Sequence, residues 1–248
     1  MKIVAIGGGE IGRPGTKIET RGIDERIIAL TGKKKPKLLF IPTASFDSVG
    51  YCDVVKNYFG GALGCKVSVL CLLDKSLTQK SIKEAIYSTD IVYVGGGNTE
   101  YMMRAWRKLR VDQLLRSATK KGVILSGLSA GAICWFRYGN SDSRRIGNPD
   151  APLIRVRGTN LIPALFCPHY DVEKDREDEI KEVMKRTPGV AICAENGTAI
   201  EIVDDSYQML RSIKKAKIYK VYWKRGVYYK EEIKQVKEYR PLKELLSK

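Results

Sequence analysis

The sequence has no long hydrophobic run, and this excludes several classes of protein. No apolar stretch among its 248 residues approaches the ~18 residues of a membrane-spanning helix. The opening segment MKIVAIGGGE has four consecutive apolar residues before its glycines, too few for the hydrophobic region of a secretory signal. We therefore expect a cytoplasmic protein with no membrane partner, and we interpret its first residues as a buried strand.

Paired cysteine motifs, repeats, low-complexity segments and linkers are also missing. The six cysteines show neither a Cys-X-X-Cys motif nor zinc-site spacing, and most lie in apolar runs such as VSVLCLL and VAICAE. This usage is typical of buried free thiols in a reducing compartment. Because 44% of the residues are apolar and nothing divides the chain, we expect one domain over residues 1–248.

Negative charge is scarce relative to positive charge, and the formal net charge is +16. Residues 211–248 hold thirteen Lys or Arg against four Asp or Glu, a net +9. Nucleic-acid binding is one interpretation, but no recognisable nucleic-acid motif accompanies the charge, so we favour a solvated basic face. The stretch KIYKVYWKRGVYYKEEI alternates as an amphipathic hairpin does, with Arg225 and Gly226 at its turn. We expect this hairpin and a short closing helix to form an appendage.

Short β-branched apolar runs alternate with helix-like segments along most of the chain. The runs are almost continuously apolar, as strands covered on both faces must be. This alternation predicts an α/β fold, a mostly parallel sheet with helices on both faces. From about residue 199, shorter strands predict a C-terminal antiparallel extension. The predicted strands are 2–6, 37–41, 66–72, 90–94, 122–126 and 190–194; the predicted helices lie near 17–31, 47–60, 78–88, 99–120, 129–137 and 173–186.

A serine lies between two glycines in the segment ILSGLSAGAICW, which fits the pattern Gly-X-Ser-X-Gly. A nucleophile on a tight strand-to-helix turn needs a strained backbone, and bulky residues two positions away would collide with the strand and helix. Such a turn exposes the hydroxyl of Ser129 above the sheet. It also directs the first amides of the helix at a reacting carbonyl, and Ala130 would supply one of these donors.

The chain has a single histidine, His169, in the segment LFCPHYDVE. A serine hydroxyl needs a base near neutral pH, so any Ser–His mechanism must use this residue. The imidazole then needs a carboxylate partner. Glu195 follows a predicted buried strand and is our first choice, while Asp171 and Asp142 remain alternatives.

A second glycine turn follows the strand predicted at 90–94, in the segment IVYVGGGNTEYMM. Phosphate binding at a helix N-terminus is one explanation. Because this loop and the serine turn follow successive strands, they are expected to lie side by side, which favours an oxyanion hole formed by the amides of Gly97 and Ala130. The segment AIGGGEIG lacks the register of a dinucleotide fingerprint, so no nucleotide cofactor is expected and Gly7 to Gly9 should shape the rim of the site.

Four segments, VGGGNT, GLSAGA, CPHYD and AENG, occur in this order along the chain. Together they resemble the peptidase E family, the serine aspartyl dipeptidases, whose wider clan includes cyanophycinase. The resemblance covers most of the chain to about residue 205. It implies a glutamine-amidotransferase-like α/β fold and a catalytic Ser129, His169 and Glu195. The same resemblance implies oxyanion donors at Gly97 and Ala130, and no metal or cofactor.

The resulting prediction is a serine exopeptidase that hydrolyses short peptides, with acidic ones favoured by the basic surface. The arginine that would bind an acidic side chain is left open. Candidates are Arg137, Arg144, Arg145 and Arg157. One alternative function is hydrolysis of a cyanophycin-like or isopeptide bond. The other is a catalytically silent relative that binds nucleic acid or protein through its basic C-terminal region.

Overall fold

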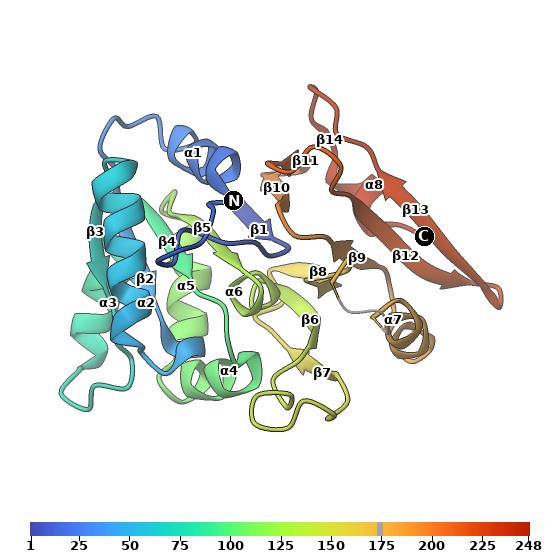
Figure 1. Cartoon of the computed structure of the whole chain (residues 1–248), viewed down its shortest axis with the longest axis horizontal. Helices are drawn as coiled ribbons and strands as arrows, with labels where there is room; N and C mark the ends of the chain where they lie inside the picture. Colours follow the sequence, from blue (N-terminus) through green and yellow to red (C-terminus); the bar gives the residue numbers. More distant parts are fainter. Residues whose placement is uncertain (173–175) are drawn as a thin grey trace.

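A computed structural model of the chain describes residues 1–172 and 176–248 (Figure 1). The described residues form two β-sheets with helices packed around them. The predicted α/β class is therefore confirmed, although the strands are divided between two sheets.

The larger sheet has eight strands in the order β14-β11-β10-β1-β5-β4-β2-β3. These strands are β1 (Lys2–Ile6), β2 (Lys37–Ile41), β3 (Lys66–Val69), β4 (Ile91–Val94), β5 (Ile124–Leu128), β10 (Thr198–Val203), β11 (Ser206–Arg211) and β14 (Arg240–Pro241). From β1 to β3 all neighbouring strands are parallel. The three strands β10, β11 and β14 add an antiparallel edge, as the sequence predicted. The carboxyl ends of β1, β4 and β5 consequently meet at one side of the sheet.

The smaller sheet has six strands in the order β13-β12-β9-β8-β6-β7. They are β6 (Phe136–Ser141), β7 (Ile154–Arg157), β8 (Ile162–Cys167), β9 (Ala191–Ala194), β12 (Ile218–Lys224) and β13 (Val227–Ile233). The strand predicted at 190–194 is present as β9, but it pairs with β8 and β12 rather than joining the predicted single sheet. The smaller sheet thus carries the segments that precede His169 and Glu195.

The helix predicted over 129–137 is wrong beyond its first turn. Helix α6 (Ala130–Ile133) is followed at once by β6, which lies so close to it that a Cβ on Gly139 would be 2.1 Å from Ile133 Cγ2. The strand has little apolar alternation because it buries polar side chains that find partners in the folded state. Ser141 Oγ, for example, lies 2.8 Å from Ser143 Oγ and 3.1 Å from Thr99 Oγ1.

Helices cover both faces of the larger sheet, as predicted. The apolar side chains of α1 (Arg21–Ala29), α2 (Val49–Val55) and the π-helix η2 (Lys56–Ala62) pack on one face. Those of α3 (Gln79–Tyr87), α4 (Thr99–Lys108) and α5 (Val111–Thr119) pack on the other. The single helix predicted over 99–120 is in fact α4 and α5. The remaining helices are η1 (Thr43–Ser45), α7 (Arg176–Lys185) and α8 (Leu242–Leu246); the start of the helix predicted at 173–186 lies outside the described residues.

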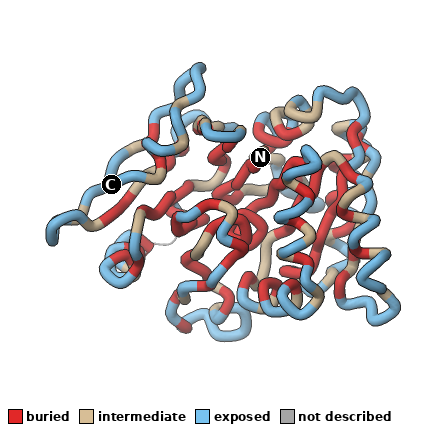
Figure 2. Tube along the Cα trace, turned by 180° about the vertical axis from the view of Figure 1, so that it is seen from behind, coloured by how far each residue is buried: buried red, intermediate tan, exposed pale blue. Residues whose placement is uncertain are grey.

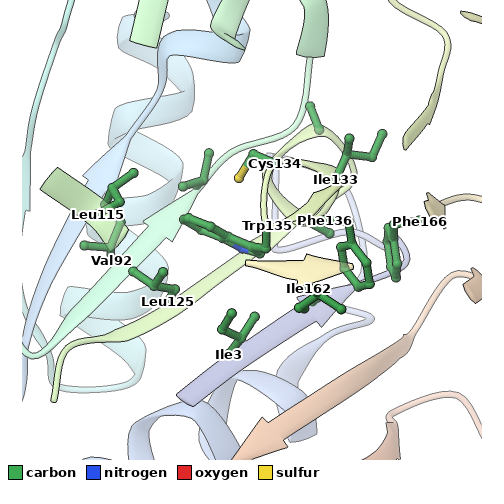
Figure 3. Close-up of a cluster of buried hydrophobic side chains, with 14 of the residues drawn as sticks. Ile3, Val92, Leu115, Leu125, Ile133, Cys134, Trp135, Phe136, Ile162 and Phe166 are labelled. Atoms are coloured by element: carbon green, nitrogen blue, oxygen red, sulfur yellow. The ribbon is translucent and has the colours of Figure 1, made fainter. Parts of the chain in front are cut away.

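The two sheets share one hydrophobic core (Figure 3). Trp135, Phe136 and Phe166 are fully buried together with Ile3 of β1 and Leu125 of β5. The rings of Phe136 and Phe166 stack with their centroids 4.7 Å apart. Each such side chain stabilises the fold by roughly 2–3 kcal/mol through burial. This packing fixes β8 of one sheet relative to β5 of the other.

The predicted amphipathic hairpin is confirmed. Strands β12 and β13 pair directly, with Arg225 and Gly226 at the turn, where their φ angles are 50° and 78°. Two positive φ angles characterise the tight turn that matches the twist of a hairpin. The outer strand is largely exposed, whereas the strands inside the sheets are buried (Figure 2).

The predicted free thiols are confirmed, since all six cysteines are unbridged and only Cys71 is partly exposed. In residues 1–172 and 176–248, no helix is both long and apolar enough to cross a membrane.

Candidate active site

Ser129 occupies the turn between β5 and α6 in a strained conformation. Its φ is 55° and its ψ is −115°, a region that residues with a side chain rarely adopt. The strain is held by neighbouring elements: Ser129 N donates to Ile6 O of β1 at 3.1 Å, and Ala132 N and Ile133 N both donate to Ser129 O at 2.9 Å. The residue is 8% exposed and lines a cavity at the carboxyl edge of the sheet.

The flanking glycines are required by the close approach of β4. A Cβ at position 127 would lie 2.6 Å from both Val94 O and Gly131 O. A Cβ at position 131 would lie 2.1 Å from Val94 O. Real Cβ atoms do not approach carbonyl oxygens this closely, so any larger residue would push α6 or β4 away. The steric reason predicted for Gly127 and Gly131 is confirmed.

His169 follows β8 by two residues and turns sharply, with a φ of 124°. Its Nδ1 lies 2.8 Å from Asn196 Oδ1. A Cβ on Gly8 would lie 2.2 Å from the same Nδ1, so the glycine leaves room for the imidazole. Gly9 lines the cavity in front of the ring. At Gly8 and Gly9 the glycines after β1 therefore shape the site, as expected.

A single cavity of about 860 Å³ brings the predicted serine and histidine together. Its floor consists of Gly96, Gly97, Leu128, Ser129 and His169. One wall is the loop after β1, from residue 9 to residue 14. The other wall is formed by η1 and the exposed side of α2 and η2. The volume lies within the range of small-ligand sites.

The backbone amides of Gly97 and Ala130, beside Ser129, are left without an acceptor in the described part of the chain. The two loops lie side by side, because β4 and β5 are parallel neighbours and a Cβ on Gly96 would be 3.5 Å from Ser129 Cβ. Gly97 has a φ of 132°, and a Cβ there would lie 2.3 Å from Ala44 O, so only glycine fits. Because these N–H groups have no acceptor in the described part of the chain, they can donate hydrogen bonds to an oxyanion.

Glu195, the carboxylate predicted to orient the histidine, makes its hydrogen bond elsewhere in the described part of the chain. Glu195 Oε2 instead accepts a hydrogen bond from Lys217 N at 2.8 Å, and burial raises the pKa of this carboxyl. Asp171 Oδ1 accepts from Asn196 N at 3.0 Å. The side chain beside Nδ1 is therefore the amide of Asn196, one position beyond the residue chosen from the sequence.

Asp142, the third candidate, does not line the cavity. Its backbone oxygen accepts from Arg145 N at 2.7 Å in the loop after β6.

Comparison with known proteins identifies the family of this chain. The sequence profile of peptidase family S51 matches residues 3–210. The chain belongs to peptidase family S51. A Bacillus subtilis (strain 168) protein named uncharacterized peptidase YgaJ is 33% identical over 89% of this chain and 91% of its own length. Peptidase E from Nostoc sp. (strain PCC 7120 / SAG 25.82 / UTEX 2576) is 25% identical over 72% of this chain and 74% of its own length.

The fold of this S51 peptidase is also found among solved structures. The crystal structure of a peptidase from an acI-B1 Actinobacterium superposes with a TM-score of 0.70, covering 97% of this chain and 96% of that one, at 19% sequence identity. Family membership makes the protein a hydrolase of the serine peptidase type. The resemblance to peptidase E drawn from the four motifs is thereby confirmed.

None of the four arginines suggested by the sequence of this S51 peptidase lines the cavity. Arg137, for instance, donates from Nε to Asn160 Oδ1 at 2.9 Å. The arginine that lines the cavity is Arg13, whose Nε donates to Glu10 Oε2 at 2.6 Å. The sequence could have indicated Arg13 by its position. Both Glu10 and Arg13 lie just after the carboxyl end of β1, where ligands bind in such sheets.

Glu10 is a structural anchor of that loop. Its Oε1 accepts hydrogen bonds from the backbone amides of Ile11, Gly12 and Arg13 at 2.9, 3.1 and 3.0 Å. Partial burial alone would raise the pKa of Glu10, but its hydrogen bonds from Arg13 outweigh burial and lower it. The carboxylate is thus charged and holds the guanidinium of Arg13 at the cavity wall.

Proposed function

We propose that this S51 peptidase is a serine exopeptidase for short peptides, in which Ser129 is the nucleophile and His169 the base. The observation that carries the proposal is that the strained serine and the chain's sole histidine line one cavity. A cavity of this size accommodates a short peptide rather than a folded protein segment.

The proposed reaction begins when Ser129 Oγ attacks the scissile carbonyl carbon and His169 takes the hydroxyl proton. The carbonyl oxygen becomes an oxyanion that accepts hydrogen bonds from the amides of Gly97 and Ala130. Loss of one such donor typically raises the barrier by about 3–4 kcal/mol. His169 then protonates the leaving amine as the C–N bond breaks. Water, deprotonated by His169, attacks the acyl carbon; the C–Oγ bond then breaks, His169 returns the proton to Ser129 Oγ, and the acid is released.

Asn196 is proposed as the group that orients the imidazole, in place of the predicted Glu195. Its Oδ1 lies 2.8 Å from Nδ1, so it can accept a hydrogen bond from Nδ1–H; in that tautomer Nε2 is the basic nitrogen that receives the proton of Ser129. An amide in this role has a precedent in Cys–His–Asn peptidases. The hydrogen bond from Asn196 N to Asp171 Oδ1 holds the amide in place.

Arg13 is proposed to bind a carboxylate of the substrate, which supports the predicted preference for acidic peptides. Among the described residues that line the cavity, it is the one lysine or arginine. Its side chain is 71% exposed, so the guanidinium is accessible to a ligand. Glu10 aligns the guanidinium, and charge-assisted hydrogen bonds of this kind are the stronger ones in proteins.

The test is a dipeptide-library digest by the wild-type protein, Ser129→Ala and His169→Ala. We expect both variants to lose at least about 1,000-fold in kcat/KM, because members of such a unit act together. Equal hydrolysis by all three proteins would reject the proposed roles. Including β-aspartyl dipeptides in the library separates an exopeptidase from an isopeptide hydrolase of the cyanophycinase kind.

A further inference from the structure

In the loop that supplies the Gly97 amide, the amides on both sides of Gly97 are hydrogen-bonded within the protein. Gly95 N donates to Ile41 O at 3.5 Å, and Asn98 N donates to Ala44 O at 2.7 Å. Between them, Gly96 N donates to the side-chain oxygen of Tyr51 at 3.3 Å. Of four consecutive amides, three therefore have partners within the protein. The remaining amide, that of Gly97, has no partner in the described part of the chain and can donate to a ligand.

Tyr51 is held firmly enough to act as an anchor. Its ring packs edge-on against Phe40, with centroids 5.1 Å apart, and a Cβ on Gly95 would lie 2.7 Å from its Cε1. Helix α2 sets its position, since Tyr51 N donates to the helix-capping Ser48 Oγ at 3.4 Å. Burial raises the pKa of Tyr51 to about 12, so the phenol stays neutral at physiological pH.

We propose that Tyr51 is a positioning residue for the oxyanion hole, an inference that rests on the proposed function. By accepting the Gly96 N–H, its hydroxyl oxygen occupies one of two adjacent amides and fixes the peptide planes of the glycine loop. The neighbouring Gly97 N–H is then the amide presented to the reacting carbonyl. Without this acceptor, the loop loses its side-chain anchor, and the Gly96 N–H competes with the Gly97 N–H as donor to the carbonyl oxygen of the substrate.

The experiment compares wild-type enzyme with Tyr51→Phe and with Tyr58→Phe. The control, Tyr58, is also a tyrosine of the helical segment α2–η2, but its hydroxyl donates to Asp24 Oδ2 at 3.0 Å and does not line the cavity. For each protein, kcat and KM are measured on a dipeptide that the wild-type enzyme hydrolyses. The Ki of the matching dipeptide aldehyde, whose adduct with Ser129 carries an oxyanion, is measured in parallel.

We expect Tyr51→Phe to lower kcat about tenfold and to weaken the aldehyde by a similar factor, with KM changed less than twofold. Tyr58→Phe should leave kcat, KM and Ki within twofold of wild type. A merely structural role of Tyr51 would not move kcat and Ki in parallel while sparing KM. The pH profile of kcat/KM should keep its shape, because the phenol is neutral in the assay range.

Three results would overturn the proposal: an unchanged kcat, a reduced kcat with an unchanged aldehyde Ki, or an ionisation lost from the pH profile of Tyr51→Phe. If circular dichroism shows that the variant is unfolded, 3-fluorotyrosine at position 51 keeps the shape and weakens the acceptor. It should lower kcat in the same direction, and no decrease would overturn the inference. A wild-type enzyme that hydrolyses no dipeptide would reject the proposed function. An active wild-type enzyme with one of the three results above would reject only the role of Tyr51.

Discussion

A buried carboxyl outside the cavity makes the stability of this protein depend on pH. Asp24 of α1 is fully buried, and its Oδ2 accepts hydrogen bonds from Thr20 Oγ1 at 2.7 Å and from Tyr58 OH at 3.0 Å. Its Oδ1 has no partner within the described residues. Burial raises the pKa of Asp24 to about 7, against 3.8 for an ordinary aspartate. The hydrogen bonds from Thr20 and Tyr58 oppose this shift but do not overcome it.

The sign of the effect follows from proton binding. Between pH 4 and pH 7 the folded protein keeps the proton of Asp24, whereas the unfolded chain has lost it. The stabilising contribution is therefore complete below about pH 4 and declines as the pH rises through 7. Each pH unit in this window changes the free energy of unfolding by about 1.4 kcal/mol. From pH 5 to pH 8 the contribution of Asp24 should fall by roughly 3 kcal/mol.

The assay is urea unfolding of wild type and Asp24→Asn at pH 5 and pH 8. The free energy of unfolding of the variant minus that of wild type should rise by about 3 kcal/mol between the two pH values. Asp53→Asn is the matched control, since its carboxyl is 57% exposed, and its difference from wild type should stay nearly constant. A pH-independent difference for Asp24→Asn would refute the reasoning, because it would mean that the carboxyl is ionised throughout.

Three further predictions concern the site. Asn196→Ala should lower kcat/KM about 100-fold, whereas Glu195→Gln should stay within about threefold of wild type; steady-state kinetics on a dipeptide would show the reverse order if Glu195 orients the imidazole. Gly131→Ala should destabilise the fold by more than about 2 kcal/mol, because the added methyl meets backbone, and Gly50→Ala, with open space around it, should not; thermal melts compare the two. Arg13→Ala should raise KM about tenfold for acidic dipeptides and leave neutral ones unchanged in the same kinetic assay.

The parts of the fold that the sequence predicted are those where local pattern and tertiary environment agree. Strands β1 and β2 were placed to the residue, because strands buried on both faces must be apolar at every position. The serine turn was equally recognisable, since the close approach of β4 admits only glycine at 127 and 131. At these positions a single residue type satisfies the backbone, so the pattern alone is informative.

The second sheet was predicted only in part, because β6 does not have the sequence pattern of a buried strand. Strand β6 reads FRYGNS and buries Ser141, whose hydroxyl lies within hydrogen-bond distance of Thr99 and Ser143. A polar residue is tolerated inside when the tertiary structure satisfies it, and that partner is invisible in a local window. The assignment of β9 to a separate sheet has the same origin, since strand pairing is a long-range property.

A position at the end of a strand does not by itself decide which side chain contacts the imidazole, as Glu195 and Asn196 show. Both residues follow β9, and a carboxylate is the stronger partner for an imidazolium, so chemistry alone favoured the glutamate. In the structure, the amide of Lys217, just before β12, donates to the Glu195 carboxylate. The turn into β10 places Asn196 Oδ1 2.8 Å from Nδ1 of His169. In the proposed role the amide of Asn196 carries no charge, unlike the carboxylate of Glu195. In the proposed reaction the amides of Gly97 and Ala130 stabilise the oxyanion, and the aldehyde Ki of Tyr51→Phe measures how far that stabilisation depends on the anchoring of the glycine loop.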